Sequence, residues 1–130
     1  MSFTADRVVV QPDGRIVIVG TAYRIPDNDF AIVRLNVNGS FDQRIINSPF
    51  IGFDGDGKQF VGFGGNDLAQ AVKIDLSGNL YTAGNIVYAA GNIIASGVGL
   101  MKMNSAGELV NSFGSNGVLS FSMPGRLQTS

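Results

Sequence analysis

Two stretches of the sequence repeat each other and decide the fold: residues 8–20 read VVVQPDGRIVIVG, and residues 72–84 read VKIDLSGNLYTAG. Gly14 aligns with Gly78 and Gly20 aligns with Gly84, in both cases 64 residues further along the chain. Internal repetition at a fixed spacing is typical of architectures built from stacked units. The sequence therefore predicts two copies of one structural unit, residues 1–66 and residues 67–130.

The repeat extends beyond these stretches. Residues 32–41 (IVRLNVNGSF) match residues 100–109 (LMKMNSAGEL) at a spacing of 68, which aligns Arg34 with Lys102. Residues 53–57 (FDGDG) match residues 113–117 (FGSNG) at a spacing of 60. The change of spacing from 64 to 68 places an insertion in the second unit, around residues 88–96.

Each unit is predicted to be a short antiparallel meander of β-strands. The turn Pro12-Asp13-Gly14 joins two apolar runs, because proline fixes φ and the following residues tolerate tight turns. Asn38-Gly39 is a strong hairpin signal after the third run. The predicted strands are 7–11, 15–20 and 30–37 in the first unit and 73–76, 80–83 and 99–104 in the second, with a fourth beginning at Ser40 or Glu108. Residues 59–63 and 118–122 form either a link between units or an outer strand.

Several of these runs lack the alternation of apolar and polar residues that a sheet with one wet face shows. Residues 15–19 read RIVIV and residues 30–35 read FAIVRL, so apolar side chains occur at both parities. Both faces of each sheet must then be covered. Sheets stacked face to face in a ring meet that requirement, which indicates an all-β protein with β-propeller-type blades, two four-stranded antiparallel units per chain.

Composition excludes several functions. The 130 residues include 9 basic and 10 acidic side chains, so no basic field exists for nucleic acid. Without His or Cys there is no ordinary zinc site, thiolate nucleophile or Ser/His/Asp triad. Residues 86–101 are apolar but interrupted, which favours a hairpin over a membrane-spanning segment. The first six residues do not form a signal peptide.

The acidic residues offer two candidate metal sites, and for both we favour a plain turn. Asp54-Gly55-Asp56-Gly57 resembles the start of a calcium loop, but the chain's single Glu, Glu108, is 52 residues away. Asp27 and Asp29 flank Asn28 and suit an Asx turn. No catalytic, cofactor-binding or metal-binding residue is therefore predicted.

The remaining candidates also have simple structural interpretations. Residues 62–65 (GFGG) lack the Lys-Ser/Thr and the helix that a phosphate-binding loop needs. Arg34 and Lys102 could form a basic ring in an oligomer, although a long side chain that brings its charge to water is the commoner case. Aromatic residues that could contact a carbohydrate are Tyr23, Tyr81 and Tyr88, and the phenylalanines at 53, 60, 63, 113 and 121 are expected in the core.

These motifs resemble the delta-60 repeat family of bacterial β-propeller-like proteins. The matching elements are residues 11–20 (QPDGRIVIVG), residues 29–36 (DFAIVRLN), Gly39 with Asp42, and residues 63–67 (FGGND). In the second unit, residues 75–80 (DLSGNL) are closer to the related NHL-type pattern, whereas residues 112–117 (SFGSNG) return to the family form. The resemblance implies one four-stranded blade per unit and a place in secreted or surface proteins, without a common catalytic residue or ligand.

Two blades do not close a ring, because propellers need about four to eight. We therefore expect a homo-oligomer, with three copies favoured, that acts as a noncatalytic structural or interaction module and binds protein or glycan. The alternatives are a two-copy or four-copy ring, a piece of a longer chain that supplies the other blades, a filament or surface-fibre subunit, and a carboxylate-based glycosidase in which copies of Asp13 or Asp75 meet near one axis. The expected location is extracellular or at the cell surface, with no cofactor, no nucleic acid and no membrane insertion.

Overall fold

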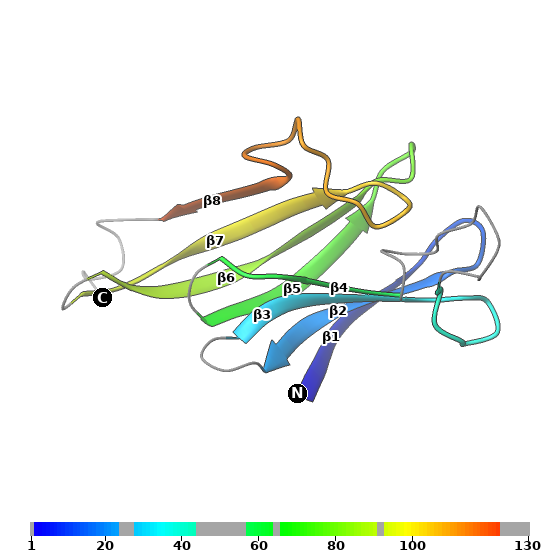
Figure 1. Cartoon of the computed structure of the whole chain (residues 1–130), viewed down its shortest axis with the longest axis horizontal. Helices are drawn as coiled ribbons and strands as arrows, with labels where there is room; N and C mark the ends of the chain where they lie inside the picture. The colour runs from blue at the N-terminus through cyan, green and yellow to red at the C-terminus, as the bar shows by residue number, and fades with distance from the viewer. Residues whose placement is uncertain (1, 24–27, 44–56, 64–65, 91–92, 123–130) are drawn as a thin grey trace.

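The computed structural model describes residues 2–23, 28–43, 57–63, 66–90 and 93–122. The described residues contain eight strands, arranged as two four-stranded antiparallel sheets in which every strand pairs with its neighbours in sequence (Figure 1). This confirms the all-β class and the two blade-like units. Sheet 1 contains β1 (Ser2–Val10), β2 (Ile16–Tyr23), β3 (Asn28–Leu35) and β4 (Lys58–Val61); sheet 2 contains β5 (Asn66–Ile74), β6 (Leu80–Ala90), β7 (Ile93–Met103) and β8 (Val118–Ser122).

The two sheets repeat each other in detail. A β-bulge interrupts the β1–β2 register between Ala5 and Arg7, and an equivalent bulge interrupts β5–β6 between Ala69 and Ala71, 64 residues later. The glycine opposite each bulge has the neighbouring strand against it. A Cβ atom on Gly20 would lie 1.8 Å from the carbonyl oxygen of Thr4, so only glycine fits there.

Matching turns close the strands. Gly14 and Gly78 both have positive φ, +93° and +88°, and their N–H groups donate to the carbonyls three residues earlier. Gly39 and Gly107 likewise have φ of +91° and +90°. Glycine adopts this left-handed conformation at no steric cost, so the repeated glycines mark repeated turns.

The fourth strands lie elsewhere than at Ser40 and Glu108, where the sequence predicted them. Near those positions the described residues make isolated bridges instead of a strand, Leu35 with Phe41 and Met103 with Leu109. The free edge of β3 is instead occupied by β4, beginning where Arg34 N–H donates to the carbonyl of Gly57 (2.8 Å). The outer-strand interpretation of residues 59–63 and 118–122 is therefore the correct one.

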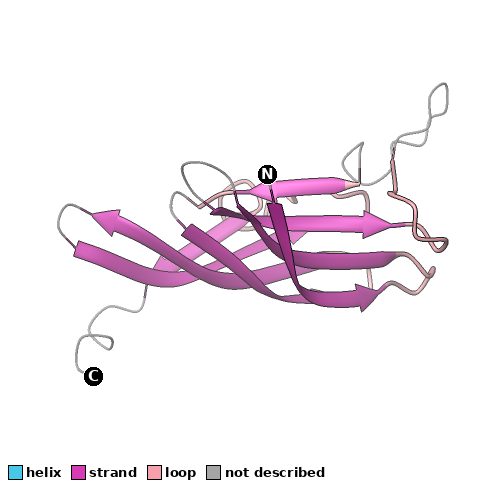
Figure 2. Cartoon of the chain, turned by 90° about the horizontal axis from the view of Figure 1, so that it is seen from below, coloured by secondary structure: helices cyan, strands magenta, loops and turns pink. Residues whose placement is uncertain are grey.

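The insertion in the second unit lengthens a hairpin. The β2–β3 pairing ends at Tyr23 opposite Asn28, whereas β6 and β7 stay paired for three further positions, out to Ala90 opposite Ile93. A hairpin across residues 86–101 agrees with the sequence prediction. Within the described ranges, which are strands and loops throughout, there is no helix long and apolar enough to cross a membrane (Figure 2).

The two sheets pack face to face, with β5 lying against β1, β2 and β3. Sheet 1 contributes Phe30 and Ile32 to the shared core, and sheet 2 contributes Leu80 and Met101, all of them fully buried. The phenyl ring of Phe63 tilts against that of Phe30, with 4.8 Å between ring centres. Within the chain, one face of each sheet packs against the other sheet. The second face of each sheet would need a further sheet to cover it, so the prediction that both faces are covered concerns an assembly and stays a prediction.

Candidate functional site

The face of sheet 1 and the face of sheet 2 that pack together are formed by residues that do not align with each other in the repeat. Residues directly opposite each other on neighbouring strands share a face. Val19 pairs with Ile32, so sheet 1 packs through the odd-numbered side chains of β2. Leu80 pairs with Met103, so sheet 2 packs through the even-numbered side chains of β6, although the repeat spacing of 64 preserves parity. Sheet 1 therefore uses one face of the unit and sheet 2 uses the opposite face.

The outward face of sheet 1 is apolar and only partly covered. Val8 and Val10 are each 62% exposed, and Ile16, Ile18 and Val33 are half-buried. Their repeat equivalents in sheet 2 are nearly all in the core, including Leu80, Thr82 and Met101 at 0% exposure. We call this surface the open face of sheet 1; its residues are Val8, Val10, Ile16, Ile18, Val33 and Leu35.

The residues on the outward face of sheet 2 are the repeat equivalents of core residues of sheet 1. The half-buried residues Tyr81, Ala83 and Leu100 are the repeat equivalents of Val17, Val19 and Ile32, which are fully buried between the sheets. On β8, Leu119 and Phe121 belong to the same surface and are 41% and 47% exposed. We call this surface the open face of sheet 2; its residues are Tyr81, Ala83, Val98, Leu100, Lys102, Leu119 and Phe121.

The two outward faces of the molecule are therefore unlike. The open face of sheet 1 is the repeat equivalent of the packed face of sheet 2, and the open face of sheet 2 is the repeat equivalent of the packed face of sheet 1. The contact between sheet 1 and sheet 2 is head-to-tail, because it joins opposite faces of the repeated unit. The open face of sheet 2 in one chain, packed against the open face of sheet 1 in another, would repeat that contact. Contiguous apolar patches on a protein surface often mark interaction surfaces. The two open faces are therefore the candidate functional site.

A buried ionic cluster accompanies the packed contact. Arg34, 5% exposed, donates from Nε to Oδ2 of Asp42 at 2.7 Å and from Nη1 to Oε1 of Gln11 at 3.3 Å. Nη1 of Arg34 also donates across to the carbonyl oxygen of Ser105 in the second unit. Nε of Arg15 lies 3.2 Å from the same Asp42 oxygen. Burial lowers the pKa of Arg34 while the Asp42 carboxylate opposes that shift, and the guanidinium stays charged.

This cluster corrects the expectation that Arg34 brings its charge to water. Its side chain joins the two units instead, and sequence reasoning overlooked Asp42 as its partner. The one available signal was the position of Asp42 three residues after Gly39, within the family pattern. The contact with Ser105 spans 71 residues and had no sequence signal.

The second unit carries different residues at the equivalent positions. Lys102 replaces Arg34, Val110 replaces Asp42 and Asp75 replaces Gln11. Nζ of Lys102 lies 5.3 Å from the centre of the Tyr81 ring, on the open face of sheet 2. The open face therefore has a cation at the position where the packed interface has its buried arginine.

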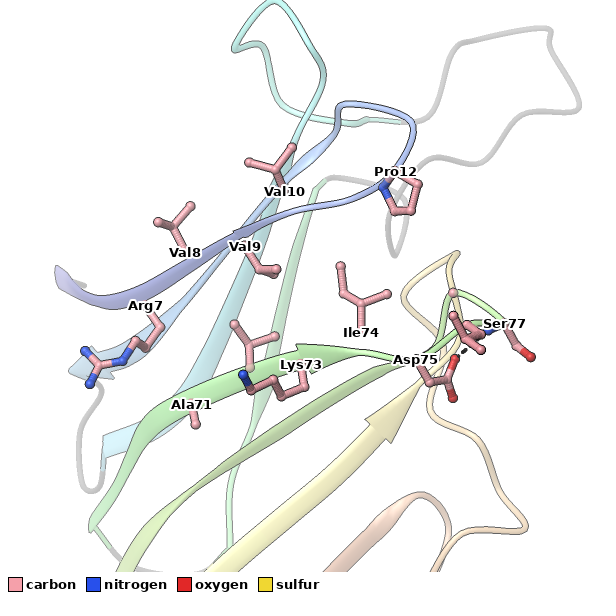
Figure 3. Close-up of a pocket in the computed structure, with 13 residues that line it drawn as sticks. Arg7, Val8, Val9, Val10, Pro12, Ala71, Lys73, Ile74, Asp75 and Ser77 are labelled. Atoms are coloured by element: carbon pink, nitrogen blue, oxygen red, sulfur yellow. Dashed lines mark hydrogen bonds between the residues drawn. The ribbon is translucent and has the colours of Figure 1, made fainter.

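An open groove of about 780 Å³ lies where β1 separates from β5 (Figure 3). Val9 and Ile74 point into the groove, whereas Val8 and Val10 lie on the far side of β1 and belong to the open face of sheet 1. Arg7 and Lys73 bring positive charge to its margin. The groove is thus an apolar cleft between the first strands of the two units.

The carboxylates near this groove serve as turn acceptors. The N–H of Arg15 donates to Oδ1 of Asp13 at 3.0 Å and lowers the pKa of that carboxyl group. The side-chain amide of Asn79 (3.1 Å to Oδ2) and its N–H (2.9 Å to Oδ1) lower the pKa of Asp75, with help from Tyr81 and Ser77. Both aspartates therefore stabilise their own turns in the ionised form.

The structure brings few of the other candidate residues together. Asp27, Asp54, Gly55, Asp56, Gly64, Gly65 and Phe53 lie outside the described residues. The carboxylate of Asp29 lies beside Gly62: a Cβ atom added to Gly62 would be 2.7 Å from Oδ1 of Asp29. Buried Asp67 accepts a hydrogen bond from the N–H of Phe63 at 2.7 Å. Within the described segments, no three His, Cys, Asp or Glu residues form a group able to hold a metal ion.

Of the tyrosine candidates, Tyr23 and Tyr81 lie on different sheets, and the side chain of Tyr88 lies outside the part that the structure describes. Tyr23 is 43% exposed at the end of β2, whereas Tyr81 is half-buried and packs its ring edge-on against Phe113, 6.2 Å between centres. Phe63 packs against the core as expected. Phe121, however, is 47% exposed, so its expected core position is wrong within a single chain.

Comparison with known proteins agrees with the architecture. Residues 11–44 match the model of a family described as a domain of unknown function (DUF5122) beta-propeller. No curated protein and no solved structure gave a significant match. The matched segment covers β2, β3 and Asp42, and it supports a β-propeller-type repeat family.

Proposed function

We propose that this protein is a noncatalytic structural or interaction module: a two-blade protomer that assembles with further copies of itself into a β-propeller, which binds protein or glycan. The observation that carries the proposal is the mismatch of faces within the chain. Two unlike faces pack together, and the chain's open faces are their repeat equivalents. A second copy of the chain therefore offers each open face a partner of the required shape.

A head-to-tail contact has defined consequences for the size of the assembly. If the rotation from blade to blade closes, three copies give six blades, within the usual range of about four to eight. Two copies and four copies are the other closed rings, and a rotation that does not close gives a filament. We favour the trimer, with the filament as the alternative.

The ligand side of the proposal rests on the groove between β1 and β5. In a ring of such sheets the first strand of each blade would lie toward the axis, so this groove would open into a central channel. A location outside the cell or at its surface is part of the same proposal. The carboxylate-based glycosidase is less favoured, because the oxygens of Asp13 and Asp75 accept hydrogen bonds within their own turns.

The experiment that tests the proposal is the native mass of the purified chain, measured by light scattering after size exclusion. Three chains of 13.7 kDa would give a discrete species of about 41 kDa. Polymers of indefinite size would favour the filament. A folded species at the mass of one chain would overturn the assembly proposal. Binding on a glycan array without hydrolysis would separate the interaction module from the glycosidase.

A further inference from the structure

Polar side chains of sheet 1 hold a specific turn of the second unit. Arg34 donates to the carbonyl of Ser105, and Nε2 of Gln59 donates to the carbonyl of Gly107 at 3.0 Å. Both carbonyls belong to the turn that follows β7, residues 104–108. The contact therefore recognises backbone acceptors of one turn, in addition to packing apolar side chains.

The first unit has the same turn at residues 36–40. The N–H of Asn36 donates to the carbonyl of Ser40 at 2.7 Å, as the N–H of Asn104 does to that of Glu108 at 2.8 Å. The glycine of each turn has nearly the same positive φ, +91° at Gly39 and +90° at Gly107. The two turns therefore present their carbonyl groups in the same arrangement.

The turn at residues 36–40 is open on the side where its equivalent is covered. Val37 is 70% exposed and its equivalent Ser105 is exposed too, so the difference between the two turns lies at their glycines. A Cβ atom added to Gly39 would have no described atom within 4 Å. Gly107, in contrast, is buried under Gln59.

Lys102 is the repeat equivalent of Arg34 and lies on the open face of sheet 2. We infer that, between two copies of this chain, Lys102 of one copy donates a hydrogen bond to the backbone carbonyl of Val37 in the next. This inference rests on the head-to-tail assembly proposed above. The hydrogen bond from Lys102 would fix the position of the turn at residues 36–40 of one copy against β7 of the other.

The second donor has no counterpart at this contact. Leu119 stands at the position equivalent to Gln59 and is 41% exposed. An apolar residue there adds buried area but no hydrogen bond. Lys102 is therefore the residue that sets the register of the contact between copies, and its charge-assisted bond is of the stronger class.

Cross-linking tests the geometry directly, because the chain has no cysteine of its own. We would mix Tyr81→Cys and Val37→Cys variants, which both keep Lys102, and treat them with a short bismaleimide; Tyr81 lies directly opposite Lys102 on the same face. The control pair is Asn85→Cys with Val37→Cys, because Asn85 lies on the same sheet face four residues further along β6 than Tyr81. That displacement is about 13 Å. The expected result is a covalent dimer mainly from the 81–37 mixture.

A second measurement keeps the test independent of the cysteine variants. Lys102→Met keeps most of the apolar stem but removes the donor, so the dissociation constant between copies should rise about tenfold or more, whereas Lys102→Arg should keep it near wild type. A wild-type chain that stays monomeric would overturn both the assembly and this contact. An assembly that is unaffected by Lys102→Met, or that cross-links equally through position 85, would overturn the Lys102 contact alone.

Discussion

Arg34 and Asp42 form a buried ion pair with 2.7 Å between Nε and Oδ2, and the same arginine reaches across to the second unit. Replacing Asp42 with Ala would leave a buried guanidinium without its carboxylate. We expect this change to lower the free energy of unfolding by about 3–5 kcal/mol. Urea denaturation at fixed protein concentration would measure it.

The matched control is the exposed pair of Asp13 with Arg15, 2.7 Å apart. Asp13→Ala should cost about 1 kcal/mol, mostly through loss of the turn hydrogen bond. The double variant Arg34→Met with Asp42→Ala should be more stable than Asp42→Ala alone, because no unpaired charge remains buried. Equal losses for Asp42→Ala and Asp13→Ala would contradict the burial argument.

Two neighbouring residues on β2 should respond differently to the same substitution. Val17 is fully buried between the sheets, so Val17→Asp places a charge in the core and should unfold the chain, as should Ile32→Asp. Ile18 points to the open face of sheet 1, so Ile18→Asp should leave the monomer folded and prevent assembly. Circular dichroism and native mass separate the two outcomes, and an assembled, folded Val17→Asp variant would refute the packing.

Acid should destabilise the fold through its turns. The folded-state pKa values of Asp13 and Asp75 are lowered by hydrogen bonds, chiefly from the Arg15 N–H and from Asn79. Both carboxylates therefore add stability above their unfolded pKa, about 3.9, and this stability is lost as pH falls through the folded values. The urea concentration at the midpoint of unfolding should decrease as the pH is lowered from about 5 to about 2. Asp75→Asn should flatten that dependence, and an unchanged slope would count against it.

Gly20 is required by space, whereas Gly39 is required by its backbone angle. A Cβ at position 20 would lie 1.8 Å from a backbone oxygen, and one at position 39 would meet nothing within 4 Å but would adopt φ of +91°. Gly20→Ala should therefore cost about 3 kcal/mol or more, and Gly39→Ala about 1–2 kcal/mol. Thermal unfolding of the two variants compares them. A smaller loss for Gly20→Ala would show that β1 can move away.

Much of the fold follows from local chemistry that repeats. Gly14, Gly39 and their partners in the second unit fix the turns, and the apolar runs between them fix the strands. The fourth strand was expected at Ser40 because Asn38-Gly39 predicts a hairpin, and a hairpin need not continue as a strand; residues 59–63 were predicted only as either an outer strand or a link between units. The residues that pair with β3 lie after Gly57, at a distance along the chain that local signals do not cover.

The candidate site was only half visible in the sequence. Apolar side chains of both parities, as in RIVIV, indicate two faces that need cover, and they say nothing about whether the same chain supplies it. Val17 and Ile18 read alike in the sequence, yet one is in the core and the other on an open face. Arg34 read as an exposed cation because its acceptors, Asp42 and Ser105, come together only in the folded chain.

The most direct test of the account mixes two variants, each damaged on one open face. Ile18→Asp keeps the open face of sheet 2, and Ala83→Asp keeps the open face of sheet 1. Each alone should remain monomeric, because a head-to-tail contact needs both faces. The account predicts that the mixture forms a 1:1 dimer by analytical ultracentrifugation. A mixture that stays monomeric while the wild type assembles would contradict head-to-tail packing through these faces.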